Sequence, residues 1–141
     1  MLERKIVESK TDDDIKYLKD AINAYNLDKV KATIEGYSKF HFKVVSEDCS
    51  YSGGILGYLG YWGGLEIDTL FVMPELRGKG LGSSLLKRME KTAKANGATM
   101  ATLDTFDFQA LHFYTRHGYE CFGELKNFPT GHSRFYLSKT L

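Results

Sequence analysis

The stretch Leu65–Leu86, LEIDTLFVMPELRGKGLGSSLL, decides the fold that we expect for this chain. It predicts a strand that ends at Pro74, because proline lacks the N–H donor that a strand ladder needs. A loop with glycine at positions 78, 80 and 82 follows, and then the first turns of a helix. Glycine lets the backbone approach a ligand closely, and the N–H groups at a helix start favour anions. The stretch therefore predicts a binding site for a diphosphate.

The hydrophobic pattern on either side of this stretch predicts a mixed α/β sheet in one chain. Apolar residues at helical spacing indicate helices over 13–25, with a cap at Thr11, and over 80–96, and shorter helices are expected over 26–37 and 108–117. Strands are expected over residues 2–8, 40–47, 55–62, 65–73, 98–105, 119–125 and 133–139. Gly57 and Gly60 interrupt one of these strands and indicate a bulge or the close approach of a ligand.

Composition limits the class of protein. The 141 residues predict a single domain over 1–141, and the net charge of +1 gives no reason to expect nucleic acid. Cys49 and Cys121 lie far apart, and His112 and His117 do not share a helix face, so neither a disulfide framework nor a metal site is expected. No window approaches the roughly 18 apolar residues that cross a membrane, and the charged N-terminus lacks a signal core. A cytoplasmic protein with no membrane partner is the expectation.

The glycine loop has other interpretations. A Walker A loop is excluded because the chain lacks its Lys-Ser/Thr pair. A dinucleotide fingerprint needs a third glycine where Ser83 stands, although a nucleotide-binding domain stays open as a distant alternative. The loop can also be a glycine turn that serves only the packing of strand on helix.

Two segments carry a resemblance to a known family. Val72–Gly82, VMPELRGKGLG, resembles motif A of the GCN5-related N-acetyltransferases (GNAT), whose core Q/R-x-x-G-x-G/A is matched by Arg77, Gly80 and Gly82. Ala110–Tyr119, ALHFYTRHGY, resembles the family segment A-x-x-F-Y-x-x-x-G-F/Y. The resemblance implies a mostly antiparallel sheet of about six to seven strands, flanked by helices and splayed between the fourth and fifth strands. It also implies acetyl transfer from acetyl-CoA to a primary amine by direct transfer in a ternary complex, without metal.

The resemblance assigns roles residue by residue. The loop N–H groups would bind the CoA diphosphate, and pantetheine would pair with the exposed edge of the strand before the loop. The implied cofactor contacts are Leu70, Phe71, Val72, Arg77, Gly78, Lys79, Gly80, Leu81, Gly82, Ser83, Asp107, Gln109 and Phe113. Asp107 stands where many family members have asparagine, and Gln109 can supply the amide instead, because an ionised carboxylate does not donate.

The same resemblance supplies acid and base candidates. Leu70 N–H is the candidate donor to the thioester oxyanion. Glu66 is the first choice as base, acting through water, and Asp68 shares that role or attracts a cationic amine. Tyr114 is the candidate acid that protonates the sulfur. The alternative is that these carboxylates sit on a wet sheet face and that Tyr114 is only part of the core.

The acceptor is less defined by the residues. Its pocket is expected between the first helical region, the strand end 58–62 and the loop 106–108, with Tyr61, Trp62 and Phe106 as aromatic walls for an apolar or cationic group. Core packing is the alternative role of these rings. A small-molecule amine is favoured over a protein amine, because 141 residues leave no extra domain for a protein partner. A non-catalytic acyl-CoA sensor is the rival class, and the aromatic C-terminal hairpin suggests a possible homodimer.

Overall fold

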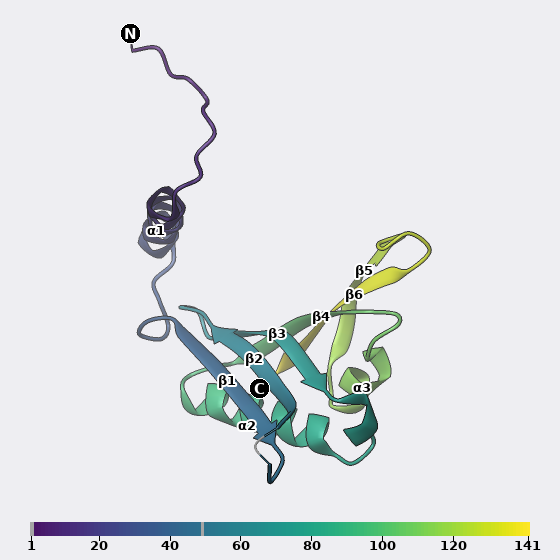
Figure 1. Ribbon diagram of the computed structural model, residues 1–141. Coiled ribbons are helices and arrows are strands. Elements are labelled where there is room, and N and C mark those ends of the chain that lie inside the picture. The colour runs from purple at the N-terminus through teal and green to yellow at the C-terminus, as the bar shows by residue number, and fades with distance from the viewer. Residues whose placement is uncertain (1, 49) are drawn as a thin grey trace. The chain divides into compact units, whose positions relative to one another are not determined.

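The computed structural model describes residues 2–48 and 50–141 (Figure 1). The chain divides into two compact units, Met1–Ala32 and Thr33–Leu141, and each is described by itself. Cys49 lies outside the described residues, and the other cysteine, Cys121, is an exposed free thiol.

The first unit is built on one helix, α1 (Asp12–Lys29). The Thr11 side chain accepts a hydrogen bond from Asp14 N–H at 3.2 Å, as the cap prediction requires. The helix continues beyond the expected 13–25 and takes in the start of the shorter helix that we expected over 26–37. The strand expected over residues 2–8 is wrong, because this segment has no regular structure and no strand pairs with it.

The second unit carries a six-stranded sheet with strand order β1-β2-β3-β4-β6-β5. The strands are β1 (Ser38–Val45), β2 (Tyr51–Leu59), β3 (Gly64–Val72), β4 (Met100–Phe106), β5 (Glu120–Lys126) and β6 (Ser133–Thr140). Only β3 and β4 are parallel among the described pairs, so the mixed, mostly antiparallel sheet is confirmed. Because residues 2–8 add no strand, the opening expected between the fourth and fifth strands falls between the third and fourth.

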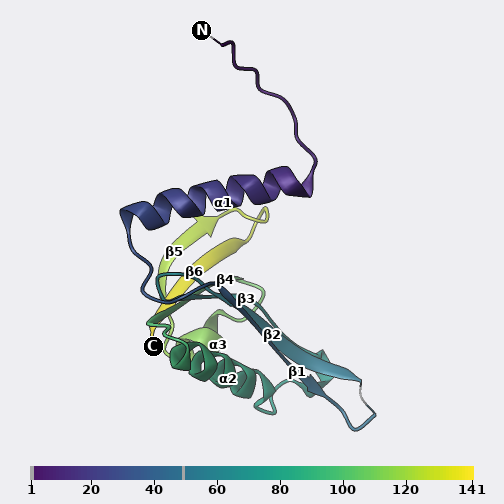
Figure 2. The same ribbon diagram turned by 90° about the vertical axis from the view of Figure 1, so that its left-hand side faces the viewer.

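Helix α2 (Leu81–Ala95) packs across one face of β1, β2 and β3 (Figures 1 and 2). Its buried residues recur at helical spacing and meet apolar side chains of the strands. These residues are Leu85, Leu86, Met89 and Ala93 from the helix, and Ile55, Leu59, Leu65 and Ile67 from the sheet. A Cβ at Gly57 would lie 3.0 Å from Met89 Sδ, so glycine is needed there for the close approach of this helix. A short helix, α3 (Leu111–Arg116), follows β4.

Two irregularities shape β3. Its register against β2 shifts beside Gly57, where Asp68 is an extra residue without a partner, so the expected bulge is present. On its other side, β3 pairs with β4 through only three residue pairs, Gly64–Glu66 with Met100–Thr102. Beyond Glu66 the two strands separate, and the sheet is splayed as predicted.

Candidate active site

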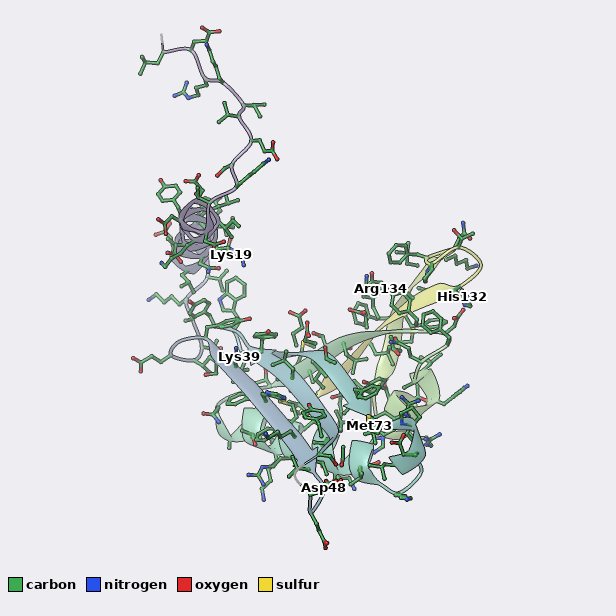
Figure 3. The ribbon with its side chains drawn as sticks, in the orientation of Figure 1. Lys19, Lys39, Asp48, Met73, His132 and Arg134 are labelled. Atoms are coloured by element: carbon green, nitrogen blue, oxygen red, sulfur yellow. The ribbon has the colours of Figure 1, made fainter. Side chains whose placement is uncertain are left out.

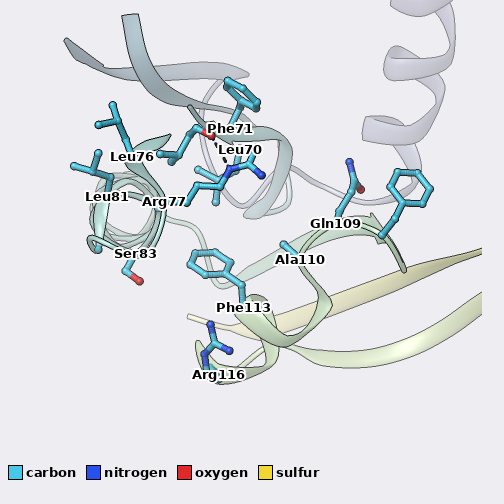
Figure 4. A pocket seen from close by; sticks show the side chains of 15 residues that line it. Leu70, Phe71, Leu76, Arg77, Leu81, Ser83, Gln109, Ala110, Phe113 and Arg116 are labelled. Atoms are coloured by element: carbon cyan, nitrogen blue, oxygen red, sulfur yellow. Dashed lines mark hydrogen bonds between the residues drawn. The ribbon is translucent and has the colours of Figure 1, made fainter. Parts of the chain in front are cut away.

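A cavity of about 680 Å³ opens where β3 and β4 separate (Figure 4). The end of β3, the glycine loop and the start of α2 form one wall, and residues 108–116 form the other. Every residue that we predicted as a cofactor contact lines this cavity except Lys79 and Asp107. Leu76, Phe108, Ala110 and Arg116 also line it and were not predicted.

The glycine loop has room for a ligand. Gly78 and Gly80 have φ of +75° and +83°, a left-handed conformation that side chains other than glycine rarely adopt. No heavy atom lies within 4 Å of the position that a Cβ would take at either residue. Because α2 begins directly after Gly80, its first N–H groups face this open space. The loop therefore fits an anion such as a diphosphate.

Arg77 closes the loop onto the strand that precedes it. Its Nε donates a hydrogen bond to the Val72 carbonyl at 2.8 Å, drawn as the dashed line in Figure 4. Its guanidinium also lies over the Phe71 ring, 5.6 Å from the centroid. These two contacts fix the arginine and leave its terminal nitrogens to face the cavity.

The backbone of β3 presents free groups to the opening. Met73 N–H donates to Ser52 O on β2 at 3.0 Å, whereas the Val72 carbonyl points away from β2 to meet Arg77. Backbone groups alternate sides along a strand, so Leu70 N–H also points away from β2 and into the gap. The predicted oxyanion donor thus lies on the free edge of the strand.

The two predicted carboxylates of β3, Glu66 and Asp68, are both exposed and stand two residues apart, so they share a face of the strand. Glu66 lies directly across from Tyr58 on β2. Asp68 accepts a hydrogen bond from Thr69 Oγ1 at 2.7 Å. Neither carboxylate forms an ion pair within the described residues.

The other two carboxylates of this region are already paired. Asp104 binds Arg134, with Oδ2 2.8 Å from a terminal nitrogen. Asp107 lies outside the cavity lining and accepts hydrogen bonds from Ser133 N–H at 2.9 Å and from His132 Nδ1 at 2.8 Å. Partial desolvation opposes these bonds, yet they prevail and hold the pKa of Asp107 below its ordinary value. Figure 3 shows His132 and Arg134 on the β5–β6 hairpin.

Tyr114 is buried on α3 behind the cavity lining. Its ring meets those of Phe113 and Tyr119 edge to face. Burial, with a smaller contribution from the Asp104 charge, raises its pKa to about 12, so the phenol stays protonated at neutral pH. Its hydroxyl has no hydrogen-bond partner among the described residues. Every fully buried side-chain oxygen among those residues does have a partner, so the Tyr114 oxygen is not fully buried. The phenol oxygen therefore reaches open space, where it can donate.

The predicted aromatic walls fall into two clusters. Tyr61 lies near Tyr37, with centroids 6.3 Å apart, and Tyr37 stacks on Tyr58 at 6.0 Å. Burial, and to a smaller extent the charge of Glu66, raises the pKa of Tyr37. Glu66 lies across from Tyr58 of this cluster. Trp62 follows in the turn after β2 and is 47% exposed.

The second cluster lies at the edge of the cavity. Phe106 stacks on Phe108 with ring centroids 5.2 Å apart, and the ring of Phe128 also lies near that of Phe106. Phe108 lies within the loop 106–108 that we had placed at the acceptor site, but it was not predicted as one of the aromatic walls, and neither was Tyr37. Arg116 escaped the sequence prediction because a lone arginine in a helix has the pattern of an ordinary solvated charge.

Within residues 2–48 and 50–141, no helix is long and apolar enough to span a membrane. The same residues contain no group of three or more His, Cys, Asp or Glu side chains placed to hold a metal ion.

Comparison with known proteins identifies the family. Residues 8–119 match the acetyltransferase (GNAT) family. The chain is 37% identical over 91 residues to a blasticidin-S acetyltransferase of Streptomyces morookaense. The aligned segment covers 64% of this chain and 66% of that protein. The crystal structure of an acetyltransferase from Bacillus cereus ATCC 14579 has a TM-score of 0.87 at 33% identity, over 97% of this chain and 98% of that one.

The fold also recurs in more distant structures. One is an aminoglycoside 6'-N-acetyltransferase complexed with coenzyme A, with a TM-score of 0.63 at 18% identity over 89% of this chain and 84% of that one. The matched family segment includes the glycine loop and residues 108–116, which line the cavity described above, and Tyr114 behind that lining. This chain belongs to the GNAT acetyltransferase family.

Proposed function

We propose that this protein transfers the acetyl group of acetyl-CoA to a primary amine of a small molecule, within a ternary complex. The observation that carries the proposal is the cavity between β3 and β4, which joins an open glycine loop to a free strand edge. A glycine turn that served only packing would not need empty space where both positive-φ glycines lack a Cβ.

Acetyl-CoA supplies the activated thioester, and the chain supplies the groups that hold it. The N–H groups of Gly78–Ser83 bind the diphosphate, supported by Arg77 and Lys79. Leu70, Phe71 and Val72 present the strand edge that pairs with the amides of pantetheine. Gln109 lines the cavity and uses its Oε1 to accept from Phe106 N–H at 2.8 Å, which leaves its amide nitrogen as a donor for the ligand.

The residues of β3 prepare the attack. Leu70 N–H donates to the thioester oxygen as negative charge develops there. Glu66 removes a proton from the amine through a water molecule, because an amine of pKa about 10.4 is protonated at neutral pH and cannot attack. Asp68 draws the cationic amine to this place. The amine nitrogen then bonds to the acetyl carbon as the carbon–sulfur bond breaks.

Tyr114 completes the proton balance. Its phenol gives a proton to the departing sulfur and regains one when the new amide nitrogen loses its second proton. The first amine proton, which Glu66 accepts, passes to solvent. The support is that burial keeps the phenol neutral while its oxygen has no hydrogen-bond partner among the residues that the structure describes. With a pKa of about 12, Tyr114 should impose no loss of activity between pH 7 and pH 10.

The acceptor that fits best is a cationic small molecule. Glu66 and Asp68 lack cationic partners among the described residues, and the Tyr37–Tyr58–Tyr61 cluster beside Glu66 offers ring faces that attract cations. Trp62 and Phe106 extend the aromatic surface. The relative that acetylates blasticidin S supports a small molecule over a protein amine.

An acceptor panel tests this function. Release of CoA thiol from acetyl-CoA is measured with small diamines, amino sugars, amine-bearing nucleosides and a lysine peptide. We expect amine-dependent release with at least one small cation and little with the peptide. If none of the amines caused thiol release while CoA still bound tightly, the non-catalytic sensor would be favoured. Stabilisation by ATP or NAD in place of CoA would overturn the cofactor assignment.

Two variants test the proton carriers. Tyr114→Phe should lower kcat about 100-fold without raising KM for acetyl-CoA, since it removes only the acid. Glu66→Gln should lower kcat most near neutral pH and recover as pH approaches the pKa of the amine, because the free amine then needs no base. Unchanged turnover in Tyr114→Phe, or a flat pH profile in Glu66→Gln, would contradict the assigned role.

A further inference from the structure

The charged side chains that line the cavity are all positive. Its 15 lining residues include two arginines and no acidic side chain. Arg77 belongs to the loop after β3, and Arg116 to the end of α3, so the two cations come from opposite walls (Figure 4). Such a lining favours a ligand with more than one anionic group.

The two arginines differ in what already holds them. Arg77 is fixed by the Val72 carbonyl and the Phe71 ring. Arg116 makes no ion pair, hydrogen bond or ring contact with another side chain in the described part of the chain, although its side chain lines the cavity beside Phe113. All five of its N–H donors are thus available to a ligand.

A simpler role does not explain this placement. A cation in the last turn of a helix interacts favourably with the helix dipole. That effect accounts for the position of Arg116 in the sequence, but α3 has only six residues, and the effect does not require a side chain in a cavity. Lysines on the outer face of α2, such as Lys91, are exposed and line no part of this cavity.

CoA carries two separate anionic groups, the diphosphate and the phosphate on the ribose 3'-hydroxyl. The backbone N–H groups of the glycine loop are committed to the diphosphate in the proposed function. The second phosphate then needs a partner on the far wall, and the planar guanidinium of arginine matches phosphate oxygens two at a time.

We propose that Arg116 binds the ribose 3'-phosphate of CoA, and that this contact makes the protein select CoA over carriers with the same pantetheine arm but without that phosphate. This inference rests on the proposed function, because it takes CoA as the ligand of the cavity. Its consequence is that the acetyl group comes from free acetyl-CoA and not from a pantetheine arm attached to a protein.

Isothermal titration of the full chain with CoA and with 3'-dephospho-CoA tests the contact. We expect the wild type to bind CoA about tenfold more tightly, the scale of one solvent-accessible charge-assisted contact. Arg116→Gln should lose that tenfold for CoA and leave 3'-dephospho-CoA unchanged. Arg116→Lys should recover part of the difference, because it restores the charge without the planar fork.

The matched control is Lys91→Gln, which removes one exposed positive charge outside the cavity and should leave both affinities unchanged. As a contrast, Arg77→Gln should weaken both ligands alike, since both retain the diphosphate. With acetyl-CoA as substrate, Arg116→Gln should raise KM about tenfold while kcat stays constant.

The outcomes separate this inference from the proposed function. Equal weakening of both ligands by Arg116→Gln would place the arginine on the diphosphate and overturn the inference alone. Equal binding of both ligands by the wild type would do the same. Binding of neither ligand by the wild type would overturn the proposed function together with the inference.

Discussion

The two walls of the cavity are built by different means. The first wall, Leu70–Ser83, continues directly from β3 into α2, whose inner face is buried in the core. The second wall, residues 108–116, follows β4 and depends on side-chain hydrogen bonds around Thr105. The first wall thus takes its position from the buried face of a long helix, whereas the second combines the buried Tyr114 with a few polar contacts. A ligand held between them needs both.

The largest difference should appear when the core beneath the first wall is emptied. Leu86 is fully buried against the sheet, and Leu86→Ala should lower the free energy of unfolding by about 3 kcal/mol, through lost burial and a residual cavity. Leu125→Ala, on the half-exposed β5, should cost less than about 1 kcal/mol. Urea denaturation of both variants measures the two losses in the free energy of unfolding. Equal losses would mean that the hydrophobic support is not concentrated under α2.

A smaller loss of stability is expected when the hydrogen bonds of Thr105, which support the second wall, are removed. The buried Thr105 hydroxyl accepts from Ala110 N–H at 3.3 Å and donates to Gln109 Oε1 at 3.4 Å. Thr105→Val keeps the shape but leaves Ala110 N–H without its acceptor, whereas Gln109 Oε1 still accepts from Phe106 N–H. This change should cost about 1 to 2 kcal/mol and raise KM for acetyl-CoA. Thr115→Val removes an exposed hydroxyl from α3 and serves as control. An unchanged KM with reduced stability would show that these hydrogen bonds support the fold without shaping the wall.

The loop of the first wall should respond to its backbone conformation alone. Gly80 and Gly64 both have empty space at the Cβ position, but only Gly80 has a positive φ, of +83°. Gly80→Ala should therefore cost about 1 kcal/mol and weaken CoA binding, while Gly64→Ala should be close to neutral. Thermal unfolding and CoA titration measure the two effects. Equal behaviour of the two variants would remove the argument that the loop conformation requires glycine.

The smallest expected effect is on the stability of the protein at low pH. The pKa of Asp107 is lowered in the folded state, so the stability that it contributes is present above its unfolded pKa and is lost as pH falls through the folded value. Unfolding curves between pH 6 and about pH 3 should therefore lose less stability in Asp107→Asn than in the wild type. His132→Gln keeps the carboxylate and tests its partner. Identical acid limbs in Asp107→Asn and the wild type would show that this contact does not support the second wall.

The first wall was also the more predictable of the two. Apolar residues at helical spacing predicted a helix over 80–96, and the buried residues of α2, Leu85, Leu86, Met89 and Ala93, follow that spacing. Local rules suffice there, because a helical period and a glycine loop are written in adjacent residues. The cofactor contacts read from the same stretch line the cavity, apart from Lys79.

The second wall depends on contacts between distant residues. Asp107 was expected at the cofactor, and it accepts hydrogen bonds from His132 and from Ser133 at the start of β6. No local pattern predicts that pairing. Thr105 gave no signal for the same reason. A short local pattern misled at residues 2–8, where Ile6 and Val7 suggested a strand that lacks any pairing partner in the sheet. Arrangements set by long-range contacts are beyond what a single sequence indicates.

The short seam between β3 and β4 has a consequence for how the sheet forms and opens. β1, β2 and β3 follow one another through short turns, so their pairing closes small loops, whereas the three pairs of the seam join segments separated by all of α2. Closing that longer loop costs more entropy and yields few hydrogen bonds. We therefore expect the seam to form late in folding and to be the first part of the sheet to separate. The amides beside the cavity should exchange with solvent through a local opening that leaves the two halves of the sheet intact.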